Sequence, residues 1–179
     1  MLFSPLELAG VYLVELEPKR DERGFFARSF CEDEFARAQL PTRFPQSNLS
    51  RNPRKGTLRG MHYAAPPSQE SKLIRCVAGV IQDVLVDVRR ASTTFGKWIS
   101  LELSRDNALA LFVPAGVAHG FLTLVDDTDV QYQMGEVFRA DTARGFCWND
   151  AAFEIAWAAA PSVISTRDAT YPPFVPSGP

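Results

Sequence analysis

Residues 80–89, VIQDVLVDVR, carry the alternation that decides the fold class. Successive side chains of an extended strand point to opposite faces, so this stretch separates into two distinct sets. One face is aliphatic except at Gln82: Val80, Val84, Val86 and Val88. The other face mixes aliphatic and acidic residues: Ile81, Asp83, Leu85 and Asp87. Carboxylates among aliphatic side chains indicate a strand whose inner side is partly polar or borders a cleft.

The same period of two continues through most of the chain. Residues 97–103 place Ile99, Leu101 and Leu103 on one face. Other candidate strands follow the same criteria: 11–16, 44–50, 57–63, 71–78, 108–113, 118–125 and 129–134. A single helix is predicted over 32–39, ended by Pro41. Many strands with one short helix predict an all-β sandwich, barrel or jelly roll.

The composition indicates one globular domain spanning 1–179. The chain has 179 residues, of which 46% are hydrophobic and 22% charged, and it has neither an internal repeat nor a linker. Residues 171–179 are rich in proline and are predicted to form an irregular tail. The net charge of -2 shows no basic surplus, so nucleic-acid binding is not expected.

The chain is expected to be a cytoplasmic protein with reduced thiols. No run of about 18 apolar residues predicts a membrane span, and the first residues do not resemble a signal peptide. Cys31, Cys76 and Cys147 lie far apart without a C-x-x-C pair. Neither a disulfide framework nor a zinc site is therefore predicted.

The two histidines of the chain stand in patterned segments. His62 lies in TLRGMHY, residues 57–63, and His119 lies in VPAGVAHGF, residues 113–121. Two histidines are few for a metal site made only of protein ligands, whereas one suffices for a general base. This favours proton transfer without a metal. Strict alternation predicts that His62 and Arg59 point to opposite faces of their strand.

Polar and cationic residues surround His62 on the predicted strands. Arg59, Lys72 and Arg75 are close in sequence, and Gln46 alternates with Asn48 on the preceding strand. Cations near a polar concave face suit a phosphorylated or anionic ligand.

Other chemistries have weaker support in the sequence. No H-x-H pair is present, although a metal site using both histidines with carboxylates is an alternative. No G-x-S-x-G, G-x-G-x-x-G or Walker sequence is present either. Nucleophilic catalysis and phosphate binding by a glycine-rich loop are therefore not predicted.

The ordered motifs resemble the dTDP-4-dehydrorhamnose 3,5-epimerase family over about residues 5–172. The matching segments are DERGFF at 21–26, QSNLS at 46–50, LRGMHY at 58–63, PP at 66–67, KLIR at 72–75, DVLVDVR at 83–89, PAGVAHGF at 114–121, WND at 148–150 and STRD at 165–168. The resemblance implies a cupin-like jelly-roll barrel with a few short helices. It also implies an isomerase that needs neither metal nor cofactor.

The resemblance assigns catalytic roles to four residues. The substrates of this family are nucleotide-linked 4-keto-6-deoxy sugars, whose carbonyl acidifies the hydrogens on carbons 3 and 5. His62 would be the base and Asp168 its partner. Lys72 would face the developing enolate oxygen, and Tyr132 would be the acid on the opposite face of the sugar. The implied reaction inverts carbon 3, carbon 5 or both.

The resemblance also implies residues that bind the nucleotide diphosphate or the sugar. These are Arg23, Gln46, Asn48, Arg59, His119, Phe138 and Arg167. In this family the N-terminal segment that bears Arg23 reaches into the site of the neighbouring subunit. A homodimer is therefore implied.

Departures from the family pattern concern the nucleotide end of the site. Arg28 and Ala143 stand where glutamates are usual, and Phe138 replaces a tyrosine that stacks on thymine. Arg167 replaces a frequent lysine and keeps its charge. Phenylalanine can still stack, whereas a glutamate-to-arginine exchange reverses a charge. We predict that the chemistry is retained, with cytidine, guanosine or uridine as alternatives to deoxythymidine in the nucleotide carrier.

Three other functions remain as alternatives. A nucleotide-sugar 3,4-ketoisomerase would use a similar fold and proton transfer, but its motifs differ from LRGMHY and AHGF. A non-catalytic sugar-binding cupin gains nothing from a complete acid–base set. A metal-dependent dioxygenase is the third alternative.

Overall fold

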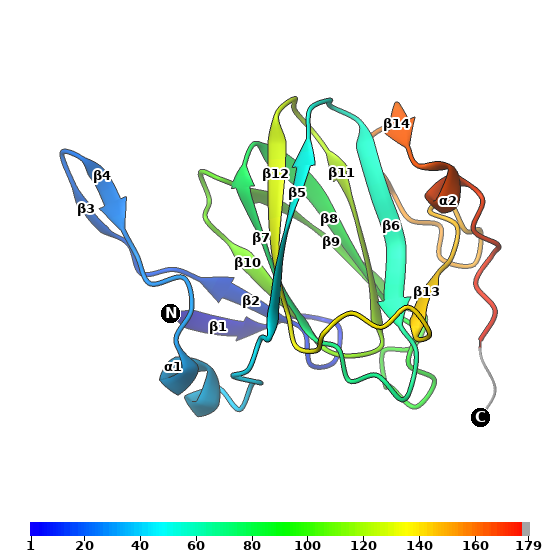
Figure 1. Ribbon diagram of the computed structural model, residues 1–179, viewed down its shortest axis with the longest axis horizontal. Coiled ribbons are helices and arrows are strands. Elements are labelled where there is room, and N and C mark those ends of the chain that lie inside the picture. The colour runs from blue at the N-terminus through cyan, green and yellow to red at the C-terminus, as the bar shows by residue number, and fades with distance from the viewer. Residues whose placement is uncertain (177–179) are drawn as a thin grey trace.

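The computed structural model describes residues 1–176 and folds them into two facing β-sheets (Figure 1). The first sheet has six strands, in spatial order β1 (Leu2–Pro5), β2 (Tyr12–Glu15), β10 (Ala110–Val113), β7 (Lys72–Ala78), β12 (Thr128–Met134) and β5 (Gln46–Asn52). The order of the second sheet is β13 (Ala143–Gly145), β6 (Thr57–Ala64), β11 (Val117–Thr123), β8 (Val80–Asp87) and β9 (Trp98–Ser104), and β14 (Val163–Ile164) also pairs with β6. The predicted all-β architecture is confirmed.

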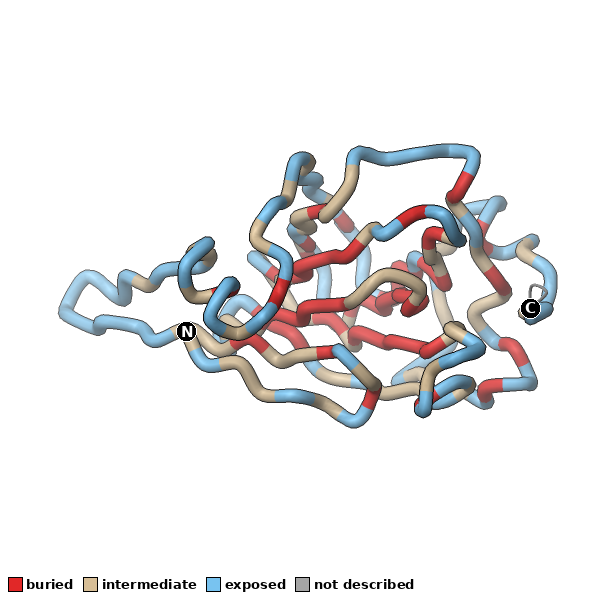
Figure 2. Tube along the Cα trace, turned by 90° about the horizontal axis from the view of Figure 1, so that it is seen from below, coloured by how far each residue is buried: buried red, intermediate tan, exposed pale blue. Residues whose placement is uncertain are grey.

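The remaining elements are small and lie outside the two sheets. Strands β3 (Lys19–Asp21) and β4 (Gly24–Phe26) form a separate hairpin that projects away from the sheets (Figure 1). Helix α1 spans Glu32–Arg37, and helix α2 spans Thr166–Ala169. The hairpin is exposed along its length, whereas buried residues concentrate in the facing strands (Figure 2).

The main core lies between the sheets and is built by the inward face of each strand. Its fully buried members include Ile74, Ile81, Leu85, Leu103, Leu111 and Phe121. Burying a side chain of this size stabilises the fold by about 1.5–3 kcal/mol. This packing holds the sheets at a fixed separation, which is the condition for a preformed cavity between them.

Strand β8 is buried on both faces, which explains its nearly continuous hydrophobic sequence. Ile81 and Leu85 enter the core between the sheets. Val84 and Val86 pack outward under the chain that follows β13, among Phe146 and Phe153. Gln82, the exception in the aliphatic face, donates from Nε2 to the Ala156 carbonyl and accepts from the Ala158 N–H. Gln82 therefore anchors the backbone of residues 156–158 to β8.

The predicted strands agree with the observed ones to within two residues at each end. The helix predicted over 32–39 ends at Arg37, because Gln39 adopts a left-handed φ of 58° that stops helical pairing. The short elements β1, β3, β4, β13, β14 and α2 have too few residues to show a periodic pattern and were not predicted.

The C-terminal segment is irregular but docked. Residues 171–176 form no helix or strand, while positions 177–179 of the predicted tail lie outside the described residues. The Cys147 N–H donates to the Pro172 carbonyl over 3.0 Å, and the Phe174 N–H donates to Asp150. Figure 1 shows this segment running beside β13 and β6. In the described part of the chain, no helix combines the length and apolarity needed to cross a membrane.

Candidate active site

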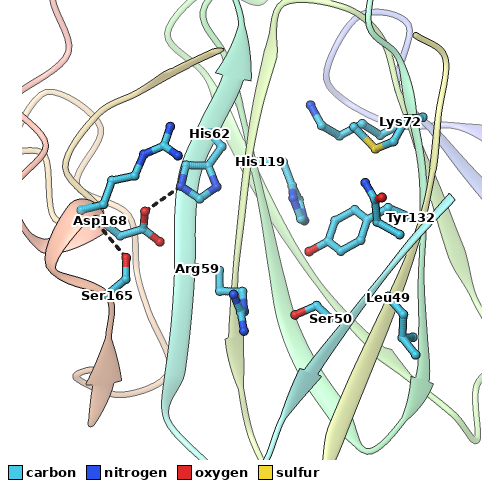
Figure 3. Close-up of a pocket in the computed structure, with 12 residues that line it drawn as sticks. Leu49, Ser50, Arg59, His62, Lys72, His119, Tyr132, Ser165 and Asp168 are labelled. Carbon is cyan, nitrogen blue, oxygen red and sulfur yellow. Dashed lines mark hydrogen bonds and ion pairs between the residues drawn. The ribbon is translucent and has the colours of Figure 1, made fainter. Parts of the chain in front are cut away.

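A cavity of about 390 Å³ opens between the two sheets. Its lining comes from β5, β6, β7, β11, β12 and the turn around α2: Asn48, Leu49, Ser50, Arg59, His62, Lys72, His119, Tyr132, Met134, Ser165, Arg167 and Asp168. The site has all four predicted catalytic residues in its wall. Figure 3 shows His62 on β6 and Tyr132 on the opposite side of the space.

His62 and Asp168 form a hydrogen-bonded pair. The imidazole Nε2 lies 2.8 Å from Asp168 Oδ1, and the carboxylate is buried while the His62 ring is half exposed to the cavity. Burial raises the pKa of Asp168, but the hydrogen bond and charge of His62, with help from the Gly60 N–H and Arg167, hold it below its usual range. Asp168 therefore stays ionised and accepts the Nε2 proton, which leaves Nδ1 of His62 free to take a proton.

The turn that presents Asp168 follows from the local sequence. Ser165 caps helix α2, and its Oγ accepts the Asp168 N–H over 3.1 Å. A serine at the N-cap satisfies one of the unpaired N–H groups of the first turn. Asp168 Oδ2 also accepts the Gly60 N–H over 3.3 Å. The carboxylate is thus held from two sides and cannot rotate freely away from His62.

The prediction that Arg59 and His62 face opposite sides is wrong, because both line the cavity. In the pairing of β6 with β11, His62 lies opposite His119 and Arg59 lies opposite Phe121. Three steps on β6 therefore match two on β11, which is a β-bulge with one extra residue on β6. The extra residue reverses the alternation and places Arg59 in the wall of the same cavity as His62.

Glycine is required at the bulge. Gly60 has a φ of 137°, and a Cβ there would lie 2.6 Å from the Gly120 Cα. Only glycine adopts this backbone region readily and permits this close approach of two strands.

A second histidine–carboxylate pair lies deeper in the site. His119 Nε2 is 2.7 Å from Asp83 Oδ2, and both side chains are buried. Asp83 Oδ1 has no hydrogen-bond partner among the described residues. Burial raises the pKa of Asp83, and the charge and hydrogen bond of His119 oppose this effect. Asp83 was not predicted as a site residue, but its place on the inner face of residues 80–89 was the available signal.

Tyr132 faces the cavity from β12, and its ring meets that of His119 edge-on with centroids 5.8 Å apart. Burial and the negative charge of Asp83 raise the pKa of Tyr132, against a smaller opposing effect of Arg59. Tyr132 therefore keeps its proton at neutral pH and can donate it. Figure 3 shows its hydroxyl pointing into the space between the sheets.

Lys72 begins β7 and is buried, with its Nζ 3.0 Å from Glu70 Oε1. The ion pair holds the ammonium group in place at the cavity wall. Glu70 was not predicted from the sequence, because a glutamate between strands is most often a solvated surface residue.

Amide groups form a short chain along the entrance. Gln46 donates from Nε2 to Asn48 Oδ1 over 3.1 Å and accepts the Phe138 N–H over 2.9 Å. Arg59 donates from Nε to the buried Asn52 Oδ1 over 2.8 Å, which orients its guanidinium group. Gln46 thereby connects the main cavity to the loop that bears Phe138.

An adjoining cavity of about 190 Å³ contains Phe138, Ala143 and Arg144, and it shares His62, Lys72, Met134 and Arg167 with the main cavity. The two cavities therefore form one continuous site around His62. Phe138 is exposed at its rim, where its ring is accessible for stacking.

Two predicted residues, Gln46 and Arg23, line neither cavity. The Arg23 side chain is 83% exposed on the projecting hairpin and pairs with Asp21 over 2.5 Å. Arg28, which follows the hairpin, pairs with Glu34 of α1 over 2.8 Å. Within this chain the hairpin therefore contributes nothing to the site.

The described residues include no group of three or more histidine, cysteine, aspartate or glutamate side chains arranged to hold a metal ion. In the His62–Asp168 and His119–Asp83 pairs, the imidazole Nε2 is hydrogen-bonded to the carboxylate.

Comparison with known proteins decides the family. The family model described as dTDP-4-dehydrorhamnose 3,5-epimerase matches residues 5–175. The chain belongs to the dTDP-4-dehydrorhamnose 3,5-epimerase family. A relative from Sinorhizobium fredii bearing this name is 40% identical over 173 residues, covering 96% of this chain and 89% of the relative.

Solved structures of family members have the same fold. The epimerase from Bacillus anthracis, with TDP and PPi bound, superposes with a TM-score of 0.93 at 36% identity and covers 97% of this chain and 99% of its own. ChmJ, a 3'-monoepimerase from Streptomyces bikiniensis in complex with dTDP-quinovose, gives 0.87 at 31% identity, with 94% and 86% covered. The predictions of a cupin-like jelly roll, of an isomerase and of epimerase activity on a nucleotide-linked 4-keto-6-deoxy sugar are confirmed.

Proposed function

We propose that this epimerase acts on a dTDP-linked 4-keto-6-deoxy sugar through His62, Lys72, Tyr132 and Asp168. The observation that carries the proposal is the His62–Asp168 pair facing Tyr132 across one cavity. A base and an acid on opposite walls are what inversion of a carbon centre requires, because the proton leaves one face and returns to the other.

His62 begins the reaction in this proposal. Its free Nδ1 takes the hydrogen from the carbon beside the sugar carbonyl, and the C–H electron pair moves into an enolate. The nearby carboxylate of Asp168 stabilises the imidazolium that results, over a hydrogen bond of 2.8 Å. This stabilisation is present only once the imidazole is charged, so it lowers the barrier more than it strengthens substrate binding.

Lys72 stabilises the enolate oxygen in this proposal. Its ammonium group is buried and held by Glu70, so its position does not depend on substrate binding. A fixed positive charge in a site shielded from water interacts strongly with developing negative charge.

Tyr132 completes the inversion by giving its phenolic proton to the carbon from the opposite wall. The raised pKa of Tyr132, caused mainly by burial, keeps the hydroxyl protonated until the enolate is present. The imidazolium and phenolate that remain return to their starting states by proton exchange with solvent.

The substrate proposal rests on the relatives and on the charges of the site. The Bacillus anthracis epimerase binds TDP and PPi, and ChmJ binds dTDP-quinovose. In this chain Arg59, Arg144 and Arg167 border the continuous cavity. Guanidinium groups suit a diphosphate, and the exposed Phe138 ring at the rim suits a nucleobase.

The relatives differ in the number of carbon centres that their names say they invert. The Sinorhizobium fredii protein is named a 3,5-epimerase and ChmJ a 3'-monoepimerase. We propose inversion at both carbons, because the family relatives named as 3,5-epimerases are the more similar in sequence.

A homodimer is part of the proposal. Arg23 projects on a hairpin that also exposes Phe25 and Phe26 to 47% and 79%. Exposed aromatic side chains on a projecting arm favour docking against another chain. In a dimer the arm would bring Arg23 to the diphosphate of the neighbouring site. We also propose a cytoplasmic location, in keeping with the free thiols of all three cysteines.

Proton NMR in deuterium oxide tests the proposal. With dTDP-4-keto-6-deoxyglucose we expect loss of the hydrogen signals at carbons 3 and 5, and a matched sample of His62→Asn should bind without exchange. Exchange at carbon 3 alone would indicate a monoepimerase, and exchange only with a cytidine, guanosine or uridine diphosphate sugar would overturn the carrier. A product with its carbonyl at carbon 3 would identify a ketoisomerase. Retained exchange in His62→Asn would refute the assigned base.

A further inference from the structure

We infer that Tyr171 is a positioning residue that holds both the base His62 and the cation Arg167 in their working orientations. This inference rests on the proposed function. Tyr171 lies in the irregular C-terminal segment, outside every motif that the sequence pointed to. It borders neither cavity and acts through the two residues that do.

The segment that bears Tyr171 is fixed on both sides of the ring. On the N-terminal side lies helix α2, which ends at Ala169. Asp168 of this helix accepts a hydrogen bond from the Gly60 N–H. On the other side, the Pro172 carbonyl accepts the Cys147 N–H over 3.0 Å. Phe174 then packs against Phe146 with ring centroids 5.4 Å apart. The Tyr171 ring is therefore held at a defined place against the second sheet.

Gly145 provides the space for that ring. Gly145 lies opposite His62 in the pairing of β13 with β6. A Cβ on Gly145 would come within 2.4 Å of Tyr171 Cζ. The cross-strand position beside the base thus has no side chain of its own, and the Tyr171 ring occupies it instead.

The ring contacts His62 directly. The centroids of the two rings are 5.9 Å apart at an interplanar angle of 68°, which is an edge-to-face contact. Asp168 fixes Nε2 of the imidazole, and the tyrosine ring limits the remaining rotation of the ring plane. Two supports in different directions are needed to hold a planar base within the narrow tolerance of a proton transfer.

The hydroxyl of the same tyrosine holds Arg167. Arg167 Nε donates to Tyr171 Oη over 2.7 Å, and its Cζ lies 5.5 Å from the ring centroid. Arg167 lines both cavities, and its charge contributes to the lowered pKa of Asp168. One side chain therefore couples the orientation of the base to that of a substrate-binding cation, with the ring serving His62 and the hydroxyl serving Arg167.

This division of roles separates the effects of two substitutions. Tyr171→Phe keeps the ring and removes the hydroxyl, so we expect KM to rise about five-fold, the worth of one net hydrogen bond, with kcat within about two-fold of wild type. Tyr171→Leu removes both supports, so we expect the same rise in KM and in addition a fall in kcat of about ten-fold. Tyr12→Phe, on the distant strand β2, is the matched control and should change neither constant.

A double-mutant cycle isolates the hydroxyl contact. In an Arg167→Ala background, Tyr171→Phe should have no further effect on KM, because the group that the hydroxyl orients has been removed. Additive effects on KM would overturn this part of the inference. Unchanged kcat in Tyr171→Leu would overturn the support of His62 by the ring.

A measurement without substrate separates the inference from the proposed function. With only two histidines in the chain, His119→Asn identifies the imidazole C–H signal of His62 in an NMR spectrum. We expect an NOE from the Tyr171 ring to His62, and a shift of the His62 signal in Tyr171→Leu that is absent in Tyr171→Phe. A His62 signal that is indifferent to both substitutions refutes the inference, whereas lack of exchange by the wild type with every sugar nucleotide would refute the proposed function alone.

Discussion

Replacement of Asp168 by asparagine should inactivate the enzyme more severely than the nearly identical shapes of the two side chains suggest. In the wild type, Oδ1 accepts from His62 Nε2 and Oδ2 accepts the Gly60 N–H. Asparagine has only one oxygen. If that oxygen serves Gly60, the amide NH2 faces His62 and requires Nε2 to be an acceptor. The proton then sits on Nδ1, the atom that takes the substrate hydrogen in the proposed mechanism.

The magnitude follows from the two hydrogen bonds. If the amide turns so that its oxygen accepts from Nε2, His62 regains the tautomer with a free Nδ1, but the buried Gly60 N–H loses its partner. This loss costs about 1–3 kcal/mol, which lowers the fraction of enzyme in the active tautomer by about 5- to 150-fold. Loss of the carboxylate charge beside the imidazolium adds a further factor of about ten. We expect kcat to fall on the order of 10²- to 10³-fold, with substrate binding nearly unchanged.

The assay is the rate of hydrogen exchange at the sugar carbons, with Asp127→Asn as a matched control at an exposed ion pair with Arg51. Asp168→Ala is the decisive comparison. Alanine imposes no tautomer on His62, so the alanine variant should be at least as active as the asparagine variant. If asparagine clearly retains more activity than alanine, Asp168 merely orients the ring and the tautomer reasoning is wrong.

Three further predictions concern the scaffold and the enolate. Burial opposes ionisation of Asp87, but hydrogen bonds from Arg89, Ser92 and Thr94 outweigh it and lower its pKa from 3.8 to about 2. At pH values above the ordinary pKa, the ionised Asp87 therefore adds roughly 2 kcal/mol to the free energy of unfolding, and this contribution is lost as the pH falls toward 2. Denaturant titrations at several pH values should show this loss in the wild type and not in Asp87→Asn. Gly60→Ala should destabilise the fold by at least about 2 kcal/mol, seen as a lower Tm, because its Cβ meets Gly120. Lys72→Gln should reduce kcat about 10²-fold or more with little change in KM, and an equal rise in KM instead would show that Lys72 only binds substrate.

Alternation along the strands was sufficient to predict much of the fold. The two faces of residues 80–89 correspond to two different hydrophobic clusters, and the polar inner positions include Asp83 at the cavity. The short strands β13 and β14 escaped prediction because two or three residues cannot display a period. Both strands pair with β6, so they depend on contacts between distant segments of the chain.

The bulge in β6 shows where local reasoning failed. Alternation is a property of one strand, whereas a bulge is a property of a pair, since it depends on the register of β6 against β11. The glycine at position 60 was visible in the sequence, but a lone glycine does not reveal which strand approaches it. Arg59 therefore joined His62 in the cavity against expectation.

The amino-acid sequence alone determined the fold class, through alternation, and it predicted the residues proposed for proton transfer, through motifs that resemble those of one family. Only the tertiary structure decided how these residues meet. His62 and Asp168 are separated by 106 positions, and their hydrogen bond exists because β6 and the α2 turn pack together. The same holds for Tyr171, which lies opposite Gly145 beside the base. Local patterns encode the direction of a side chain relative to its own backbone, whereas a site requires the relative placement of distant segments, which depends on packing of the whole chain.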